Sequence, residues 1–244
     1  MMKNSTLILM IFFCLKFYAQ KNEPILSLTV TDPWLMVIGS DIPEFTLYDN
    51  GELIYKVQKR KKVKLRRVKL ENDEITDWIS FVENNGLDSL KENYDASYLT
   101  DQPYNRLLVN TDNLQKEISV YGYLNKNNQY EKTRKLTPSN FLKIYDRLST
   151  YKNRKSKKWI PDFIEVMFWP YNHSPEKPKA WPENWPDFSN KRTVDRDGLY
   201  SVYLKKNHLK ELNDFIESLG EKQAVEINGK KWSISYRYPL PHQY

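Results

Sequence analysis

Residues 207–238 specify a helix followed by a β-hairpin: NHLKELNDFIESLGEKQAVEINGKKWSISYRY. Asn207 can cap the helix and Gly220 can end it, and between them apolar residues recur at the spacing of one helix face. These residues are Leu209, Leu212, Phe215, Ile216 and Leu219. Asn228 and Gly229 both tolerate positive φ, so they predict a tight turn between strands over 224–227 and 230–238.

The same order of elements is expected earlier in the chain. A helix is predicted from Asn72 to Gly86, with Ile75, Trp78, Ile79 and Val82 on its apolar face. Strands over 106–110 and 116–121 follow, joined through residues 111–113. The second strands of the two hairpins have similar sequences, KEIS at 116–119 and KWSI at 231–234, so a duplication is an open alternative.

Strands are also predicted before each helix. Segments 45–48 and 53–57 flank the turn residues Asp49, Asn50 and Gly51, and 63–70 is a third strand. Segments 163–169 and 199–204 precede the second helix. A further helix is expected after Thr137-Pro138, with four apolar residues on one face. They are Phe141, Ile144, Tyr145 and Leu148.

This pattern predicts an α+β fold: two related modules of antiparallel strands with a helix packed on each sheet, plus a third helix near the module boundary. The cationic segment 152–158 places that boundary. The expected division is a signal peptide at 1–20, an N-terminal strands-helix-hairpin module with its closing helix at 21–151, and a C-terminal strands-helix-hairpin module at 152–244.

The first 20 residues have the features of an export signal. Lys3 precedes the apolar run TLILMIFFCL at 6–15, which is too short to cross a bilayer comfortably. Cleavage after residue 19 or 20 would release a cysteine-free periplasmic or extracellular protein, because Cys14 is the only cysteine. The bulky Phe17 keeps an uncleaved anchor open as an alternative, and Phe13 before Cys14 argues against a lipoprotein. No later stretch is apolar and long enough to span a membrane.

Several short motifs resemble those of modules of unknown function in exported bacterial proteins. They are FTLYDNG at 45–51, YDA at 94–96, TDQP at 100–103, SVYG at 119–122, INGKKW at 227–232 and YRYP at 236–239. This resemblance implies an exported α+β protein. It assigns no activity and no site.

The densest positive charge lies at 56–69, KVQKRKKVKLRRVK. In a strand, side chains of one parity would align their cations, with Val63 and Leu65 turned inward. Lys61, Lys62, Arg66 and Arg67 are therefore candidates for binding an anionic glycan or lipid, since export argues against nucleic acid. The alternative is a solvated strand whose lysines protect a sheet edge.

Three Trp-Pro pairs lie at 169–170, 181–182 and 185–186. Proline restricts itself and the residue before it, so the segment is expected to form a stiff aromatic loop. Trp169, Tyr171, Trp181 and Trp185 are the candidate contact surface. The alternative is that the tryptophans pack over the sheet.

No catalytic, cofactor-binding or metal-binding residue is assigned. His173 and Glu176 have no second histidine nearby, and Asp195 and Asp197 fit a turn better than a calcium loop. We therefore expect a non-catalytic binding or interaction module of the bacterial periplasm or cell envelope, whose partner is an envelope protein or an anionic glycan or lipid. The alternative is an envelope glycan hydrolase with paired carboxylates, for which the candidates are Glu183, Asp187 and Asp195.

Overall fold

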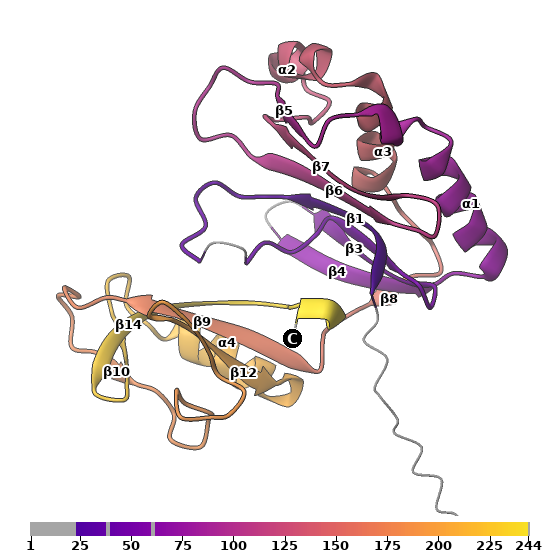
Figure 1. Cartoon of the computed structure of the whole chain (residues 1–244). Coiled ribbons are helices and arrows are strands. Elements are labelled where there is room, and N and C mark those ends of the chain that lie inside the picture. Colours follow the sequence, from indigo (N-terminus) through magenta and orange to yellow (C-terminus); the bar gives the residue numbers. More distant parts are fainter. Residues whose placement is uncertain (1–22, 38–39, 60–61, 244) are drawn as a thin grey trace, which may run out of the picture.

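The computed structural model describes residues 23–37, 40–59 and 62–243 and divides their strands between two sheets (Figure 1). The first has the order β5 (Asn93–Asp95), β7 (Gln115–Tyr121), β6 (Tyr104–Asn110), β1 (Pro24–Val30), β2 (Phe45–Tyr48), β3 (Glu52–Lys59), β4 (Lys62–Lys69), β8 (Lys157–Lys158). The second has the order β10 (Lys179–Ala180), β13 (Val225–Ile227), β14 (Lys230–Arg237), β9 (Phe163–Pro170), β12 (Leu199–Lys205), β11 (Val194–Arg196). The predicted signal peptide lies outside the described residues.

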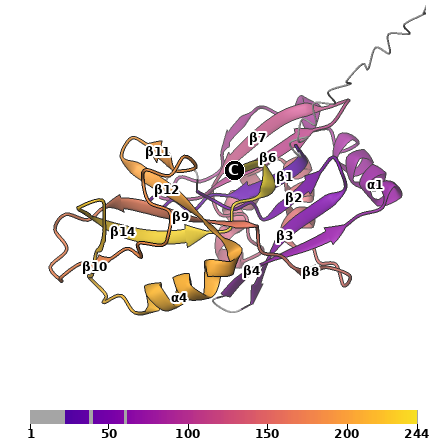
Figure 2. The ribbon, with the colours of Figure 1, turned by 90° about the horizontal axis from the view of Figure 1, so that it is seen from below.

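Helices cover one face of each sheet, which confirms the predicted α+β class. Helices α1 (Asn72–Glu83) and α3 (Ser139–Ser149) pack on the first sheet, and α4 (Leu209–Glu217) packs on the second. Figure 2 shows α4 lying along β9 and β14. The four residues predicted on the apolar face of the third helix are all buried. A short helix, α2 (Glu131–Leu136), was not predicted.

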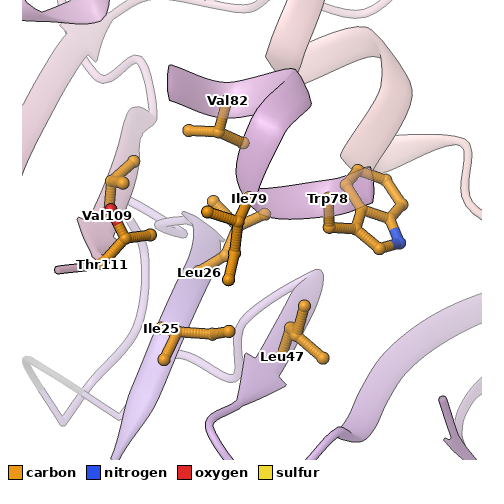
Figure 3. Close-up of a pocket in the computed structure, with 8 residues that line it drawn as sticks. All are labelled: Ile25, Leu26, Leu47, Trp78, Ile79, Val82, Val109 and Thr111. Atoms are coloured by element: carbon orange, nitrogen blue, oxygen red, sulfur yellow. The ribbon is translucent and has the colours of Figure 1, made fainter. Parts of the chain in front are cut away.

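Helix α1 closes over the first sheet without leaving room for water. Trp78, Ile79 and Val82 point from the helix toward the strands, as Figure 3 shows. They meet side chains of β1, β2 and β6, and the gap between them is too small for a water molecule. Tight packing of this kind stabilises the helix more than its intrinsic propensity does.

Three local predictions need correction. Helix α4 begins after His208, one residue later than an Asn207 cap implies. Helix α1 begins one residue earlier than an Asn72 cap implies: Glu71 is the capping residue, and its backbone N–H donates to the Glu74 carboxylate at 3.0 Å. Leu65 is buried, but Val63 is 55% exposed. Val63 lies opposite Gln58 at the end of β3 and β4 where the chain passes from one strand to the other, beyond the residues that pair with β2 or β8, so little of the sheet covers it.

The central strand of the first sheet, β1, has no counterpart among the predicted strands. It pairs with both β2 and β6. Leu26 and Leu28 enter the core beneath the helices, while Ser27 on the other face forms a hydrogen bond with Thr46 at 3.1 Å. A short, largely buried strand shows little alternation of apolar and polar residues, so periodicity gives a weak signal.

The two predicted hairpins occupy their sheets in opposite order. In the first sheet the leading strand β6 lies beside the central β1, whereas in the second the trailing strand β14 lies beside the central β9. The similar sequences at 116–119 and 231–234 therefore occupy an outer and an inner strand, respectively. The modules share their order of elements, but this strand order does not support a simple duplication.

The helix-free face of the first sheet meets the second module. Tyr48, Ile54 and Leu65 pack there against Trp159 and Leu240. The Tyr48 hydroxyl also forms a 2.9 Å hydrogen bond with Nδ1 of His242, which fixes the C-terminal segment between the modules (Figure 1). The segment expected to open the second module still belongs to the first sheet, since β8 pairs with β4.

Candidate functional site

The segment 181–186, which holds two of the three Trp-Pro pairs and which we call the Trp-Pro loop, packs both of its tryptophans inward. Trp181 and Trp185 are each only 6% exposed and belong to the core of the second module. Their rings meet edge to face with centroids 4.8 Å apart, and Phe215 of α4 lies 5.7 Å from both. The Trp181 indole N–H donates to the Pro186 carbonyl at 2.9 Å. This geometry favours the packing alternative for these two residues.

Trp169 and Tyr171 are not gathered with the other two aromatic residues. Trp169 follows the core residue Phe168 in β9, so its side chain lies on the opposite face of the sheet, where it is half-buried. Tyr171 comes just after the strand, is also half-buried, and its backbone N–H donates to the Lys231 carbonyl at 3.0 Å. The four aromatic candidates therefore do not form one surface.

A polar groove of about 490 Å³ lies over the Trp-Pro loop and the β13–β14 turn. It brings together Glu183 and Asp187, two of the three carboxylates considered for hydrolysis, and adds Glu226. Two hydrogen bonds from Ser189 and one from Asn228 lower the pKa of Asp187, which favours an ionised carboxylate rather than a proton donor. Asp195 belongs to β11 and does not line this groove.

Much of the positive charge in the β3–β4 hairpin is engaged within the chain. Nε of Arg66 donates to the Ser156 hydroxyl at 2.8 Å, and Arg67 pairs with Glu52 at 3.3 Å. Strand β8 pairs with β4 at these two arginines, so this part of β4 is not a sheet edge. Lys61 lies outside the described residues, and only the backbone of Lys62 is described. Of these four candidates, the two whose side chains are described, Arg66 and Arg67, are thus engaged within the chain.

Neither the Asp195–Asp197 segment nor His173 is placed as a metal site among the described residues. Asp197 and Gly198 both have positive φ, at 54° and 83°, and form the turn between β11 and β12. The exposed His173 has no metal-binding neighbours: within the described parts of the chain, no three His, Cys, Asp or Glu residues are placed to hold a metal ion. The described segments also include no helix of the length and apolarity that crossing a bilayer requires.

The first module has an exposed apolar surface that the sequence patterns did not indicate. Tyr98 is 95% exposed, Leu99 69% and Leu136 49%. They line one groove of about 480 Å³ between the loop after β5 and helix α2. We call these three residues the Tyr98 patch. Clustered exposed apolar side chains typically mark an interaction site.

Hydrogen bonds hold the loop that presents Tyr98 and Leu99. The Tyr121 hydroxyl donates to the Leu99 carbonyl at 2.9 Å and accepts the Gln102 backbone N–H at 3.1 Å. The Ser97 hydroxyl accepts the Leu99 backbone N–H at 3.2 Å. The backbone around the two apolar side chains is therefore fixed before any partner arrives.

Helix α2, which contributes Leu136, is also anchored. Arg134 makes two hydrogen bonds to the Asp146 carboxylate of α3, at 2.8 and 3.1 Å, and a third to the Leu124 carbonyl. Lys126 adds a 3.2 Å ion pair to Asp146. Lys132 and Lys135 line the groove beside the apolar residues.

Three of the short motifs that carry the resemblance to exported bacterial modules lie next to the Tyr98 patch. Segments 94–96 and 119–122 are joined by a hydrogen bond, in which the Ala96 N–H donates to the Tyr121 carbonyl at 3.1 Å. Segments 100–103 and 119–122 are joined in the same way, since the Gly122 N–H donates to the Pro103 carbonyl at 2.9 Å. In the sequence, residues 97–99 lie between the motifs 94–96 and 100–103. This position is the sequence signal that could have indicated the patch.

No protein-family model, curated protein or solved structure gives a significant match to this chain.

Proposed function

We propose that this protein is an exported interaction module of the bacterial cell envelope that binds a protein partner through the Tyr98 patch. The observation that carries the proposal is the 95% exposure of Tyr98, beside the 69% exposed Leu99, on a loop fixed by hydrogen bonds. Water contact with such side chains is unfavourable, and a rigid loop loses little conformational entropy on binding. Export rests on the leader sequence at 1–20.

The charges around the patch suit a partner with acidic residues at its rim. Lys132 and Lys135 line the groove, and only Lys135 has an acidic partner along α2, Glu131 at 2.7 Å. An apolar centre surrounded by charge is the usual anatomy of a protein interface. A tyrosine at its centre is a frequent source of binding energy.

Site-specific crosslinking tests the proposed surface. We expect a photoreactive phenylalanine analogue at position 98 to crosslink one protein in an envelope extract. Excess unlabelled wild-type protein should suppress this product, whereas the Tyr98→Ser/Leu99→Ser double variant should not. Truncating a large apolar side chain at the centre of an interface weakens binding about tenfold or more.

Val63→Ser is the matched competitor for that experiment, since Val63 is 55% exposed but lies in the β3–β4 hairpin. It should compete as well as the wild type. Equal competition by the double variant would contradict the proposed surface. Prior digestion of the extract with glycan hydrolases should leave the product unchanged.

The groove over the Trp-Pro loop supports a second candidate function, hydrolysis of an envelope glycan by Glu183 and Asp187. Release of reducing ends from purified peptidoglycan tests it. Activity that is lost in Glu183→Gln and Asp187→Asn but kept in Asp195→Asn would establish this function. A wild-type protein that releases nothing excludes it for this substrate.

A further inference from the structure

Another pocket of the second module, distinct from the groove over the Trp-Pro loop, combines cationic and apolar walls. It encloses about 520 Å³ and is lined by Phe163, Arg192, Val194, Arg196, Tyr203 and Gln243. Three adjacent strands, β9, β12 and β11, supply most of these residues. The volume lies within the range that small-molecule sites occupy, roughly 300 to 1,000 Å³.

Arg192 lies at this pocket, where its exposed guanidinium contacts an aromatic ring. The central carbon of its guanidinium stands 4.4 Å from the centroid of the Phe163 ring, an arrangement that orients the flat group by a cation–π contact. Within the part of the chain that the structure describes, no hydrogen bond or ion pair engages the Arg192 side chain. A guanidinium has five N–H donors, and their natural partners are oxyanions.

The charges around the pocket do not balance. Glu165 is 1% exposed and accepts two short contacts from Arg237, at 2.7 and 2.8 Å, which neutralise its carboxylate. Arg196 lies farther from Glu165, at 3.6 Å, and donates to the Ser201 hydroxyl at 2.7 Å. Glu165 thus contacts two guanidiniums, those of Arg237 and Arg196, while Arg192 stands at the same pocket, so the positive charge of Arg192 and Arg196 is in excess.

Acidic residues nearby do not remove that excess. Asp195 precedes Arg196 in β11, so its side chain lies on the other face, where it accepts the Gly198 N–H at 2.9 Å. Asp162, next to Phe163 in sequence, pairs with Lys206 at 2.8 Å. The pocket therefore presents two guanidiniums beside an apolar floor.

We propose that this pocket binds a small amphipathic oxyanion: Arg192 and Arg196 hold its carboxylate or phosphate group, and its hydrocarbon body lies against Phe163, Val194 and Tyr203. Guanidinium groups recognise both anions through paired N–H donors. The apolar walls exclude water from the body of the ligand and reward its burial. This site is independent of the Tyr98 patch, which belongs to the other module.

Titration calorimetry with defined probes tests the proposal. We expect octyl phosphate and octanoate to bind the wild-type protein, and inorganic phosphate and octanol each to bind at least about tenfold more weakly, because each lacks one half of the recognition. The two anions distinguish a phosphate from a carboxylate source of the same chemistry. Octanol binding as tight as that of both anions would overturn the role of the arginines.

Charge-matched variants locate the site. Arg192→Gln should weaken octyl phosphate binding about tenfold or more, since it removes charge-assisted hydrogen bonds. Lys191→Gln removes the same charge from the neighbouring exposed residue and should change the affinity less than about threefold. Val194→Asp, at a 37% exposed position that tolerates a polar side chain, should also weaken binding about tenfold or more by repulsion. Equal losses in Arg192→Gln and Lys191→Gln, or no loss in Arg192→Gln, would overturn the proposal.

Discussion

Glu165 is the only acidic side chain that is buried among the described residues. It lies in β9 on the face away from α4, where Arg237 of β14 contacts one carboxylate oxygen and the Ser201 hydroxyl donates to the other at 2.7 Å. Burial of a charge is unfavourable unless a partner and hydrogen bonds compensate for it. The Glu165–Arg237 pair meets both conditions because β9, β12 and β14 are neighbours.

Removing one partner of this pair should destabilise the protein strongly. Arg237→Met leaves the Glu165 carboxylate buried without its closest cation, so we expect the free energy of unfolding to fall by about 3 to 5 kcal/mol. Urea denaturation at neutral pH measures the change. The control is Lys206→Met, which breaks the exposed Lys206–Asp162 pair and should cost about 1 kcal/mol or less. Similar losses in the two variants would contradict this account.

At the scale of elements, glycines at turns determine how strands lead into one another. Gly51 and Gly198 have nearly the same φ, 81° and 83°, but different surroundings. A Cβ atom on Gly51 would lie 2.8 Å from Ile75 of α1 and 3.0 Å from the Leu70 carbonyl, whereas nothing lies within 4 Å of one on Gly198. Gly51 thus combines a turn with close approach of a helix.

This difference predicts unequal costs for the same substitution. Gly198→Ala should lower the free energy of unfolding by about 1 kcal/mol through backbone strain alone. Gly51→Ala should cost about 2 to 4 kcal/mol, because the end of the Ile75 side chain and the Leu70 backbone carbonyl must also give way. Thermal and urea unfolding of both variants measure the difference, and equal costs would show that α1 yields freely.

The Trp-Pro loop allows a test that separates packing from binding. Trp181→Ala removes a ring that contacts Trp185, Phe168 and Phe215, so we expect a loss of about 3 to 5 kcal/mol in unfolding free energy. Trp34→Ala, at a position that is 71% exposed, should stay within about 0.5 kcal/mol of the wild type. A stable Trp181→Ala protein would contradict the packing role.

For the whole molecule, stability should fall at alkaline pH because two tyrosines resist ionisation. Burial, reinforced by Glu44 and Asp146, raises the pKa of Tyr145 from 10.0 to about 12. Burial and the neighbouring Tyr236 raise the pKa of Tyr238 to about 12 as well. Tyr145 lies in the core of the first module, while Tyr238 packs against both the second core and the junction.

The direction of this change in stability follows from which state of the protein ionises its tyrosines first. The unfolded chain loses these protons near pH 10, before the folded protein does, so the stabilising contribution is complete below pH 10 and is lost as pH rises to about 12. Urea unfolding at a series of pH values measures this decline. Tyr145→Phe and Tyr238→Phe should each make it shallower, whereas Tyr98→Phe at its 95% exposed position should not. An unchanged slope in both buried variants would contradict the assignment.

The sequence alone determined the parts of the molecule that neighbouring residues encode. The apolar faces of α1, α3 and α4 follow from helical spacing, and the Asn228-Gly229 turn follows from residues that accept φ values of 50° and 71°. These properties depend on contacts a few residues apart. They were sufficient for the α+β class.

Only the tertiary structure decided what lies next to what. It placed the unpredicted β1 at the centre of the first sheet, turned Trp181 and Trp185 into the second core, and left Tyr98 and Leu99 exposed. It also brought Arg192 and Arg196 to one pocket beside Phe163 of another strand. The physical reason is that strand order and burial minimise the free energy of the whole chain, through contacts between residues far apart in sequence, and local patterns do not contain that information.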